Sequence, residues 1–401
     1  MLGSFRKRGC TCKKKRCTCG AKWHFRYDVI DLKTGKRKQK ETRGFETKAE
    51  AEAESKKILA DLQQGTFFEE KNITFEDFAN QWIEIYENSG KVKTSTVDIR
   101  KAKLKHLLYF FGKIKLKDIT KLMYQDMLLD LQKKYARKTI ASVHETGSLL
   151  FKKAVELEII SRDITEHAEM PYVRKTVAEL EEEQPVPKYL EKEELSQFLK
   201  AARNSEYPLD YPIFLCLSYT GMRVGELCSL KWRDINYIDQ TISITKTIYN
   251  KKNNTREYLV HTPKTKSSIR VIDVDELVLK TLEDHRVRQN LLRMEKRNTY
   301  FDEGYVFANE NAFPGYPLVP ADLIKRMNRI LKLAKINHKL SPHSLRHTHT
   351  SLLAEADVSL ETIMNRLGHH DDKVTRTVYL HVTKPRKKEA SQKFAKLMSG
   401  I

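Results

Sequence analysis

The sequence predicts a multi-domain, mainly α-helical protein with small β-sheets. Its 401 residues suffice for two or three domains, and the 40% that are hydrophobic suffice for packed cores. Apolar residues recur at helical spacing through residues 74–157, and no strand pattern interrupts them. Beyond residue 189 helical and strand-like segments are mixed, which is typical of an α+β domain.

The charge of the chain indicates a polyanionic partner. Lysine and arginine number 74 against 53 aspartates and glutamates, a formal net charge of +21, and over half of this excess lies in residues 1–43. Such an excess favours nucleic acid or an acidic membrane surface. The longest apolar stretch, Ile213 to Tyr219, is far shorter than the roughly 20 residues that span a bilayer, and the N-terminus lacks a secretory apolar core. We therefore expect a cytoplasmic protein that binds nucleic acid and no membrane.

Residues 1–65 predict a small basic ββα unit. Trp23 to Ile30 has the composition of a strand, and a turn at residues 33–36 would lead into a second basic strand. Thr47 is a good N-cap for an Ala/Glu/Lys-rich helix that would end near Gln63. A β-ribbon of this kind can enter the DNA major groove.

Four of the six cysteines are clustered near the N-terminus: Cys10, Cys12, Cys17 and Cys19. Four thiolates can hold one structural zinc ion, although the C-x-C spacing is tighter than the usual C-x₂₋₄-C, so reduced thiols are the alternative. Cys216 and Cys228 lie in a strongly apolar region and are expected to be inert core thiols. Without an export signal we expect no disulfide framework.

Residues 70–170 predict a compact helical domain. Thr74 and Thr120 would cap two of its helices, and two more are expected at 95–111 and 138–157. Phosphate contact and a plain solvated face are the alternatives for one cluster of basic residues, Arg100, Lys101, Lys103 and Lys105. An acidic run and Pro-Val-Pro at residues 171–188 predict a linker.

Four short motifs in the second half of the chain carry reactive side chains. In Ser341-Pro-His343-Ser-Leu-Arg346-His, the serine and proline favour a helix start that presents His343 and Arg346 on one face, where a phosphate oxygen could bind. Arg223 lies upstream in Thr-Gly-Met-Arg-Val-Gly-Glu, and His369 and Tyr379 follow in Leu-Gly-His-His and Val-Tyr-Leu-His. Singly each motif is weak, and a surface helix start is the alternative for the first.

Together these motifs resemble the tyrosine recombinase (phage integrase) family, in particular integrases of phages or integrative and conjugative elements from Gram-positive bacteria. The resemblance covers essentially the whole chain. It implies an arm-type DNA-binding domain at 1–65, a helical SAM-like core-binding domain at 70–170 and, after the linker at 171–188, a mixed α+β catalytic domain at 189–383. Residues 384–401 would form a C-terminal tail helix.

The resemblance also implies the site. Its catalytic positions match Arg223, Lys264, His343, Arg346, His369 and Tyr379. The family's lysine lies in a β-hairpin turn, and Lys264, between strand-like segments at 258–260 and 268–274, fits that position better than its competitor Lys266.

The chemistry of strand exchange agrees with these roles. A phosphotyrosine ester on Tyr379 would conserve the energy of the cut DNA bond. His343 is the candidate base for the phenol proton, and Lys264 is the candidate acid for the leaving 5′-oxygen. Arginine forks clamp phosphoryl charge well.

Arg223 and Arg346 would supply those two forks, and His369 would add a hydrogen bond. Glu226 is expected to orient Arg223 rather than to carry a proton. Surface or packing roles are expected for the neighbouring histidines His347, His349 and His370.

The resemblance implies a site-specific recombinase that integrates and excises a mobile element through a 3′-phosphotyrosine and a Holliday junction. We expect no metal or nucleotide cofactor for catalysis. Expected partners are double-stranded DNA at attachment sites, a homotetramer on that DNA, an excision factor and a host DNA-bending protein, all at the bacterial nucleoid. A type IB topoisomerase and a non-catalytic DNA-binding regulator are the alternatives.

Overall fold

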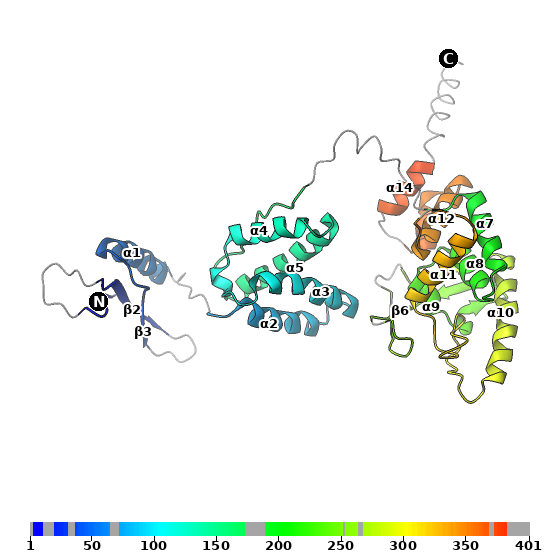
Figure 1. The fold of residues 1–401 in the computed structure, drawn as a ribbon, viewed down its shortest axis with the longest axis horizontal. Coiled ribbons are helices and arrows are strands. Elements are labelled where there is room, and N and C mark those ends of the chain that lie inside the picture. Colours follow the sequence, from blue (N-terminus) through cyan, green and yellow to red (C-terminus); the bar gives the residue numbers. More distant parts are fainter. Residues whose placement is uncertain are drawn as a thin grey trace, which may run out of the picture. The chain divides into compact units, whose positions relative to one another are not determined.

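The computed structural model describes residues 3–10, 20–30, 37–64, 72–172, 189–251, 253–263, 268–337, 339–368 and 373–382. The chain divides into two compact units, residues 1–174 and 175–401 (Figure 1). No described helix combines the length and the apolar character needed to cross a membrane.

The N-terminal part of the first unit is a three-stranded antiparallel sheet with one helix. The strands β1 (Ser4–Lys7), β2 (Trp23–Ile30) and β3 (Arg37–Glu41) lie in the order β1-β2-β3, and α1 (Lys48–Gln64) follows. Thr47 caps α1 as predicted, since its Oγ1 accepts from the backbone N of Glu50 at 3.3 Å. The helix ends within one residue of its predicted end.

The prediction of a two-stranded ββα unit is wrong by one strand. The additional strand β1 has only one apolar residue, Phe5, so no strand pattern marks it in the sequence. Its pairing partner lies 20 residues away, where Phe5 faces Phe25 across the ladder and the ring centroids are 4.9 Å apart. The turn expected at 33–36 lies outside the described residues.

The rest of the first unit is a helical bundle, as predicted. Thr74 and Thr120 both act as N-caps and accept from the backbone N of Asp77 at 3.1 Å and of Met123 at 3.2 Å. A buried aromatic cluster that includes Phe75, Tyr124 and Phe151 holds the helices together. The elements are α2 (Phe75–Asn88), α3 (Thr94–Phe111), the 3₁₀ turn Leu116–Asp118, α4 (Lys121–Gln132) and α5 (Arg137–Glu156).

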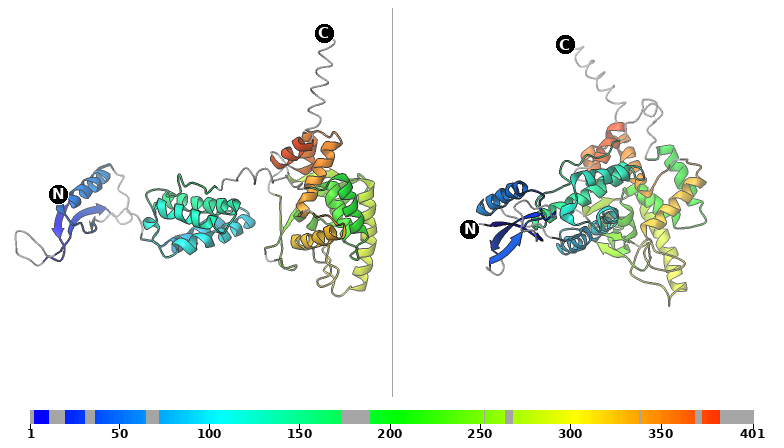
Figure 2. Two further views of the ribbon diagram at one scale, coloured as in Figure 1. Left: turned by 45° about the horizontal axis from the view of Figure 1, so that its top comes forward. Right: turned by 60° about the vertical axis from the view of Figure 1, so that its left-hand side comes forward.

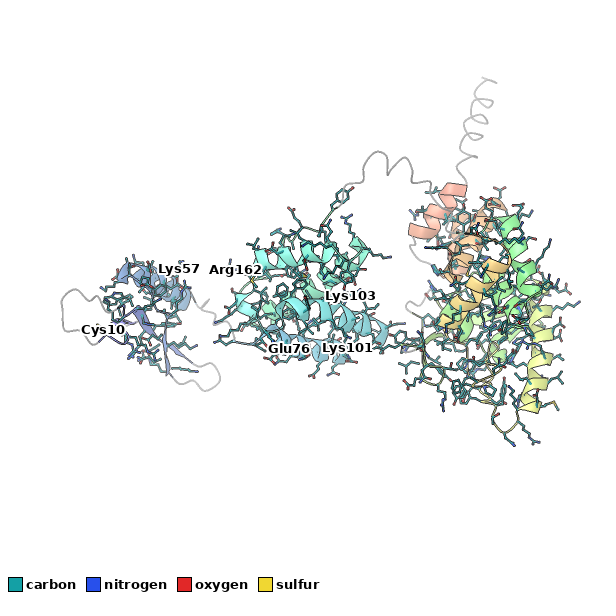
Figure 3. The ribbon with its side chains drawn as sticks, viewed as in Figure 1. Cys10, Lys57, Glu76, Lys101, Lys103 and Arg162 are labelled. Atoms are coloured by element: carbon teal, nitrogen blue, oxygen red, sulfur yellow. The ribbon has the colours of Figure 1, made fainter. Side chains whose placement is uncertain are left out.

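Arg100 is not an exposed phosphate ligand, which corrects one reading of the basic cluster on α3. It is 8% exposed, and its guanidinium donates to Glu145 at 2.6 Å and to Thr146 at 3.2 Å, so it fastens α3 to α5. Lys101, one residue later, pairs with Glu87 at the surface. Figure 3 labels Lys101 and its neighbour Lys103 among the side chains of this bundle.

The second unit is a mixed α+β domain, also as predicted. Its helices are α7 (Lys192–Arg203), α8 (Asp210–Thr220), α9 (Val224–Cys228), α10 (Glu276–Glu295), α11 (Pro320–Leu333), α12 (Pro342–Glu355), α13 (Leu360–Leu367) and α14 (Lys373–Val382). Its strands are β4 (Ile235–Asn236), β5 (Thr241–Ile244), β6 (Thr247–Tyr249), β7 (Leu259–His261) and β8 (Arg270–Asp273), with a 3₁₀ turn at Trp232–Asp234. Nearly every residue of α8 is buried.

The two cysteines of this core behave as predicted. Cys216 and Cys228 are both fully buried. Burial raises the pKa of the Cys216 thiol to about 12 and also raises the pKa of Cys228, so both are protonated and inert at neutral pH.

The strands that flank the expected catalytic lysine do not form a hairpin with each other, which corrects that expectation. β7 pairs with β6, and β8 pairs with β5 in the order β4-β5-β8. The described strands on either side, β7 and β8, therefore belong to two different sheets. Lys264 and Lys266 themselves lie outside the described residues.

We predict that Arg100→Ala destabilises the helical bundle by about 1–3 kcal/mol, because it leaves a buried hydroxyl and an ion-pair partner without their donor. Hydrogen exchange of α3 and α5 amides in the full chain measures this opening free energy. Lys101→Ala, which breaks only an exposed pair, should cost less than about 1 kcal/mol. Equal losses in the two variants would contradict the structural role of Arg100.

Candidate active site

The turn after α8 begins the site and requires glycine. Gly221 caps the helix with a φ of 62°, a conformation that L side chains rarely adopt. A Cβ at this position would lie 2.6 Å from Cδ2 of His349 and 2.7 Å from Cδ2 of Leu367. The turn therefore brings α8 into direct contact with α12 and α13, and it delivers the chain to Arg223.

Arg223 is held by Glu226, as the sequence predicts. The backbone N of Arg223 donates to Glu226 at 2.9 Å and Nη1 donates at 2.8 Å, which forms the N-terminal cap of α9. Glu226 also accepts from Nη2 of Arg270 at 3.0 Å. Burial alone raises the pKa of Glu226, but Arg270 and Arg223 outweigh it and hold the pKa below its ordinary value.

The carboxylate of Glu226 is therefore ionised at neutral pH. It acts as an orienting group and not as a proton carrier. The Arg223 side chain remains 36% exposed, so it is available to a ligand at the surface.

Arg346 is almost completely buried, with 2% exposure. Its Nη1 donates to the carbonyl of Gly221 and its Nη2 to the carbonyl of Leu367, both at 2.7 Å. These carbonyls end α8 and α13, where the helix dipole favours a positive charge. Arg346 thus joins three helices at one point.

His343 and Tyr379 lie on the elements around this point. His343 is exposed on the first turn of α12, after the predicted cap Ser341 and Pro342, and its ring meets that of His347 edge to face at 4.9 Å. Tyr379 is half-buried on α14 and packs against a small apolar cluster that includes Leu367. Figure 2 shows α14, in red, beside α12, in orange.

The structure therefore brings Arg346, the turn before Arg223 and the end of α13 together through contacts with Gly221 and Leu367. Tyr379 packs against the apolar cluster to which Leu367 belongs. Two of the expected catalytic residues, Lys264 and His369, lie outside the described residues, as do Cys12, Cys17 and Cys19. Among the residues that the structure does describe, no group of three or more His, Cys, Asp or Glu side chains could hold a metal ion.

His349 has a packing role, one of the two roles expected for it, whereas Arg366 and Arg270 lie in no motif that the sequence singled out. His349 is 6% exposed, its Nδ1 donates to Ser218 O at 2.9 Å, and its Nε2 accepts from Nε of Arg366 at 3.1 Å. These partners require the neutral imidazole with the proton on Nδ1. One signal was present, since His349 lies three residues after Arg346 and so shares its helix face.

Comparison with known proteins identifies the family. The phage integrase family matches residues 188–386, an arm DNA-binding domain matches 13–62, and a SAM-like N-terminal domain of phage integrases matches 74–132. A probable integrase of prophage ps2 in Lactococcus lactis is 32% identical over 315 residues, which cover 78% of this chain and 80% of the relative. The chain belongs to the phage integrase family. It is a tyrosine-type site-specific DNA recombinase, as the sequence motifs predicted, and the family's reaction requires no cofactor.

Solved structures support the fold of this recombinase. An integrase of transposon Tn1549, in complex with circular intermediate DNA, aligns with a TM-score of 0.62 at 20% identity over 80% of this chain and all of that chain. A lambda integrase tetramer bound to a Holliday junction aligns with a TM-score of 0.54 at 18% identity over 88% of this chain and 92% of that one. The predicted fold class, an arm domain, a helical bundle and an α+β domain, is confirmed.

We predict that Gly221→Ala destabilises the second unit by roughly 2–4 kcal/mol, because it adds a clash with His349 and Leu367 to the strain of a left-handed alanine. Thermal unfolding of the full chain measures the loss. Gly304→Ala is the matched control, because Gly304 has a φ of 72° but nothing within 4 Å of an added Cβ. If Gly221→Ala lowers the stability no more than Gly304→Ala does, the contact of Gly221 with His349 and Leu367 does not exclude a methyl group.

We predict that His349 makes the second unit less stable in acid. Burial, and then the nearby Arg366, lower the pKa of His349 to about 3 from an ordinary value of 6.5, so the unfolded chain binds a proton that the folded chain rejects. The free energy of unfolding should therefore fall as the pH drops from about 6.5 towards 3.

Urea unfolding of the wild type and of His349→Phe between pH 4 and 6 measures this term. The wild-type slope should exceed the variant slope by up to about 1.4 kcal/mol per pH unit, which corresponds to one proton. His285, another buried histidine whose pKa burial lowers to about 4, is present in both proteins and cancels in the comparison. Identical slopes would mean that His349 is not protected from protonation.

Proposed function

We propose that this recombinase integrates and excises a mobile element by exchanging DNA strands at attachment sites, with Tyr379 as the nucleophile. The observation that carries the proposal is the convergence on Leu367: its carbonyl accepts from Arg346, its side chain contacts the Gly221 turn, and it belongs to the apolar cluster against which Tyr379 packs. A basic clamp and a phenol from distant parts of the sequence thus adjoin the same apolar cluster.

In the proposed cleavage step, the phenol oxygen of Tyr379 attacks the scissile phosphorus and forms a 3′-phosphotyrosine. His343 accepts the phenol proton, and Lys264 protonates the 5′-oxygen that leaves. Arg223 and Arg346, with a hydrogen bond from His369, stabilise the negative charge on the non-bridging oxygens. Attack by the 5′-hydroxyl of a second strand reverses the chemistry, so no external energy source is needed.

The electrostatics of the described residues support the clamp. The carboxylate of Glu226 accepts hydrogen bonds from both Arg223 and Arg270. The set of Arg223, Arg270, Arg346 and Glu226 therefore keeps an excess of two positive charges, which suits a phosphate that gains charge in the transition state.

We propose that four copies act on two duplexes through a Holliday junction, in which the basic N-terminal unit grips accessory arm sites and the later domains hold the crossover site. The domain boundaries are 1–65, 70–170, 189–383 and 384–401, with a linker at 171–188. An excision factor and a host DNA-bending protein would set the direction of the reaction at the nucleoid. The net charge of +21 supports extensive contact with phosphates.

The cysteine cluster of the arm unit is proposed as a zinc site, with reduced thiols as its alternative. Four thiolates from Cys10, Cys12, Cys17 and Cys19 would satisfy one tetrahedral ion. The zinc content of the purified chain decides between them, at one ion or none per molecule. Catalysis does not depend on the result.

We predict that the wild type forms an SDS-stable adduct with a nicked duplex carrying its attachment site and that Tyr379→Phe forms none, because phenylalanine has no oxygen to form the ester. Nicked duplexes tiled from the DNA that flanks its own gene supply the substrates. Tyr211→Phe is the matched control: it removes a hydroxyl in the same unit and keeps the ring that lies 4.7 Å from the Arg203 guanidinium. It should retain the adduct.

The other outcomes of this experiment separate the alternatives. Adducts at many unrelated sequences, with relaxation of supercoils, would indicate a topoisomerase-like enzyme. Tight binding with no adduct on any flanking duplex would indicate a non-catalytic DNA-binding regulator. An adduct that persists in Tyr379→Phe would assign the nucleophile to another residue.

A further inference from the structure

Arg346 takes its position from the ends of two helices. The carbonyls that it contacts belong to Gly221, at the end of α8, and to Leu367, the last residue of α13. Hydrogen bonds weaken steeply when their distance or angle changes. Whatever fixes these two helix ends against each other therefore fixes the guanidinium.

His349 braces the end of α8. Its Nδ1–H donates to Ser218, one turn before the helix ends, and its ring lies directly against Gly221. Because His349 follows Arg346 by three residues on α12, both side chains face the same helix end. The ring thus fills the space beside the carbonyl that Arg346 uses.

Arg366 connects the end of α13 to His349 and to the end of α8. It immediately precedes Leu367, and its Nε donates to the free nitrogen of His349 at 3.1 Å. Its Nη2 donates to the carbonyls of Tyr219, in α8, at 3.2 Å and of Asp273, at the end of β8, at 2.9 Å. One guanidinium therefore ties α13 to α8, α12 and β8.

We infer that His349 and Arg366 are a pair of positioning residues for Arg346, which lock the ends of α8 and α13 so that their carbonyls aim its guanidinium at the scissile phosphate. The inference rests on the proposed function, because that function gives Arg346 its role at the phosphate. Neither residue of the pair touches DNA in this account. Both line a cavity of about 570 Å³ on the second unit.

The pair should affect the rate of cleavage much more than the affinity for DNA. A misplacement of about 1 Å in a reacting group can cost about 100-fold in rate. DNA affinity is instead the sum of many phosphate contacts made across the chain. If the pair had only a structural role, its loss would lower the cleavage rate and the DNA affinity together, by reducing the amount of folded protein.

Single-turnover adduct formation on the nicked duplex, at saturating DNA, tests the inference. His349→Phe keeps the ring but removes both hydrogen bonds, and Arg366→Gln removes the guanidinium fork. Each should slow cleavage by roughly 10- to 100-fold, with a dissociation constant within about threefold of the wild type. The double variant should be no slower than the slower single variant, because the two residues act as one unit.

A conservative variant and a matched control sharpen the test. His349→Gln offers an amide oxygen to Arg366 and should recover part of the rate. His285→Phe removes a second buried histidine of the same unit, whose Nε2 donates to Val306 O at 2.7 Å and whose Nδ1 accepts from Arg288 at 3.0 Å. It breaks equivalent bonds away from Arg346, so its cleavage rate should stay within about twofold of the wild type.

A measurement without DNA separates this inference from the proposed function. In ¹⁵N spectra of the full chain, the Arg346 Nε–H signal, assigned with Arg346→Lys, should broaden or exchange faster in His349→Phe and stay unchanged in His285→Phe. A wild type that forms no adduct would contradict the proposed function alone. An unchanged Arg346 signal, a wild-type cleavage rate in His349→Phe, or additive losses in the double variant would overturn the positioning role.

Discussion

The arrangement of the second unit depends on holding one buried guanidinium, that of Arg346, at the junction of three helices. A buried charge is costly unless hydrogen bonds replace its water shell. Here two helix C-termini supply carbonyl oxygens, which compensate the charge without neutralising it. An arginine held in this way keeps its positive charge, which the proposed reaction uses at the phosphate. The glycine at the end of α8 is part of this arrangement, because a side chain there would separate the helices.

Glu226 and His349, two similarly buried side chains near this junction, differ in charge. Glu226 is 4% exposed yet stays ionised, because two arginines contact its carboxylate. His349 is almost as buried yet stays neutral, because burial disfavours its charged form and the nearby Arg366 guanidinium repels a second positive charge. Partner chemistry, rather than burial alone, thus decides which side chains carry charge. The result is a site with fixed dipoles and an excess of positive charge before DNA arrives, which is the preorganisation that phosphoryl transfer needs.

Local signals in the sequence predicted the features that depend on neighbouring residues. Thr47, Thr74 and Thr120 each mark the start of a helix, and the structure confirms all three. The order of the reactive motifs predicted the family and the fold class. Features that depend on distant contacts could not be read in this way: β1 becomes a strand only by pairing with β2.

Arg100 and Arg366 illustrate the same limit for side chains. Arg100 was grouped with exposed lysines because they are adjacent in sequence, although it lies on the same face as the buried residues Val97 and Leu104. Arg366 gave no signal, because its partners His349, Tyr219 and Asp273 come from three other elements. The proposed catalytic lysine, Lys264, comes between two strands that pair with other strands, so the sequence pattern predicted the strands and not their partners.

The decisive measurement is the structure of the full chain trapped on a nicked attachment site. We expect a covalent bond from the Tyr379 oxygen to a 3′-phosphate, with the non-bridging oxygens in hydrogen-bond range of Arg223 and Arg346. Arg346 should keep its bonds to the carbonyls of Gly221 and Leu367, as in the free protein at 2.7 Å. A phosphate attached to another residue would contradict the role of Tyr379. Loss of both carbonyl bonds by Arg346 in the complex would contradict its positioning by the ends of α8 and α13.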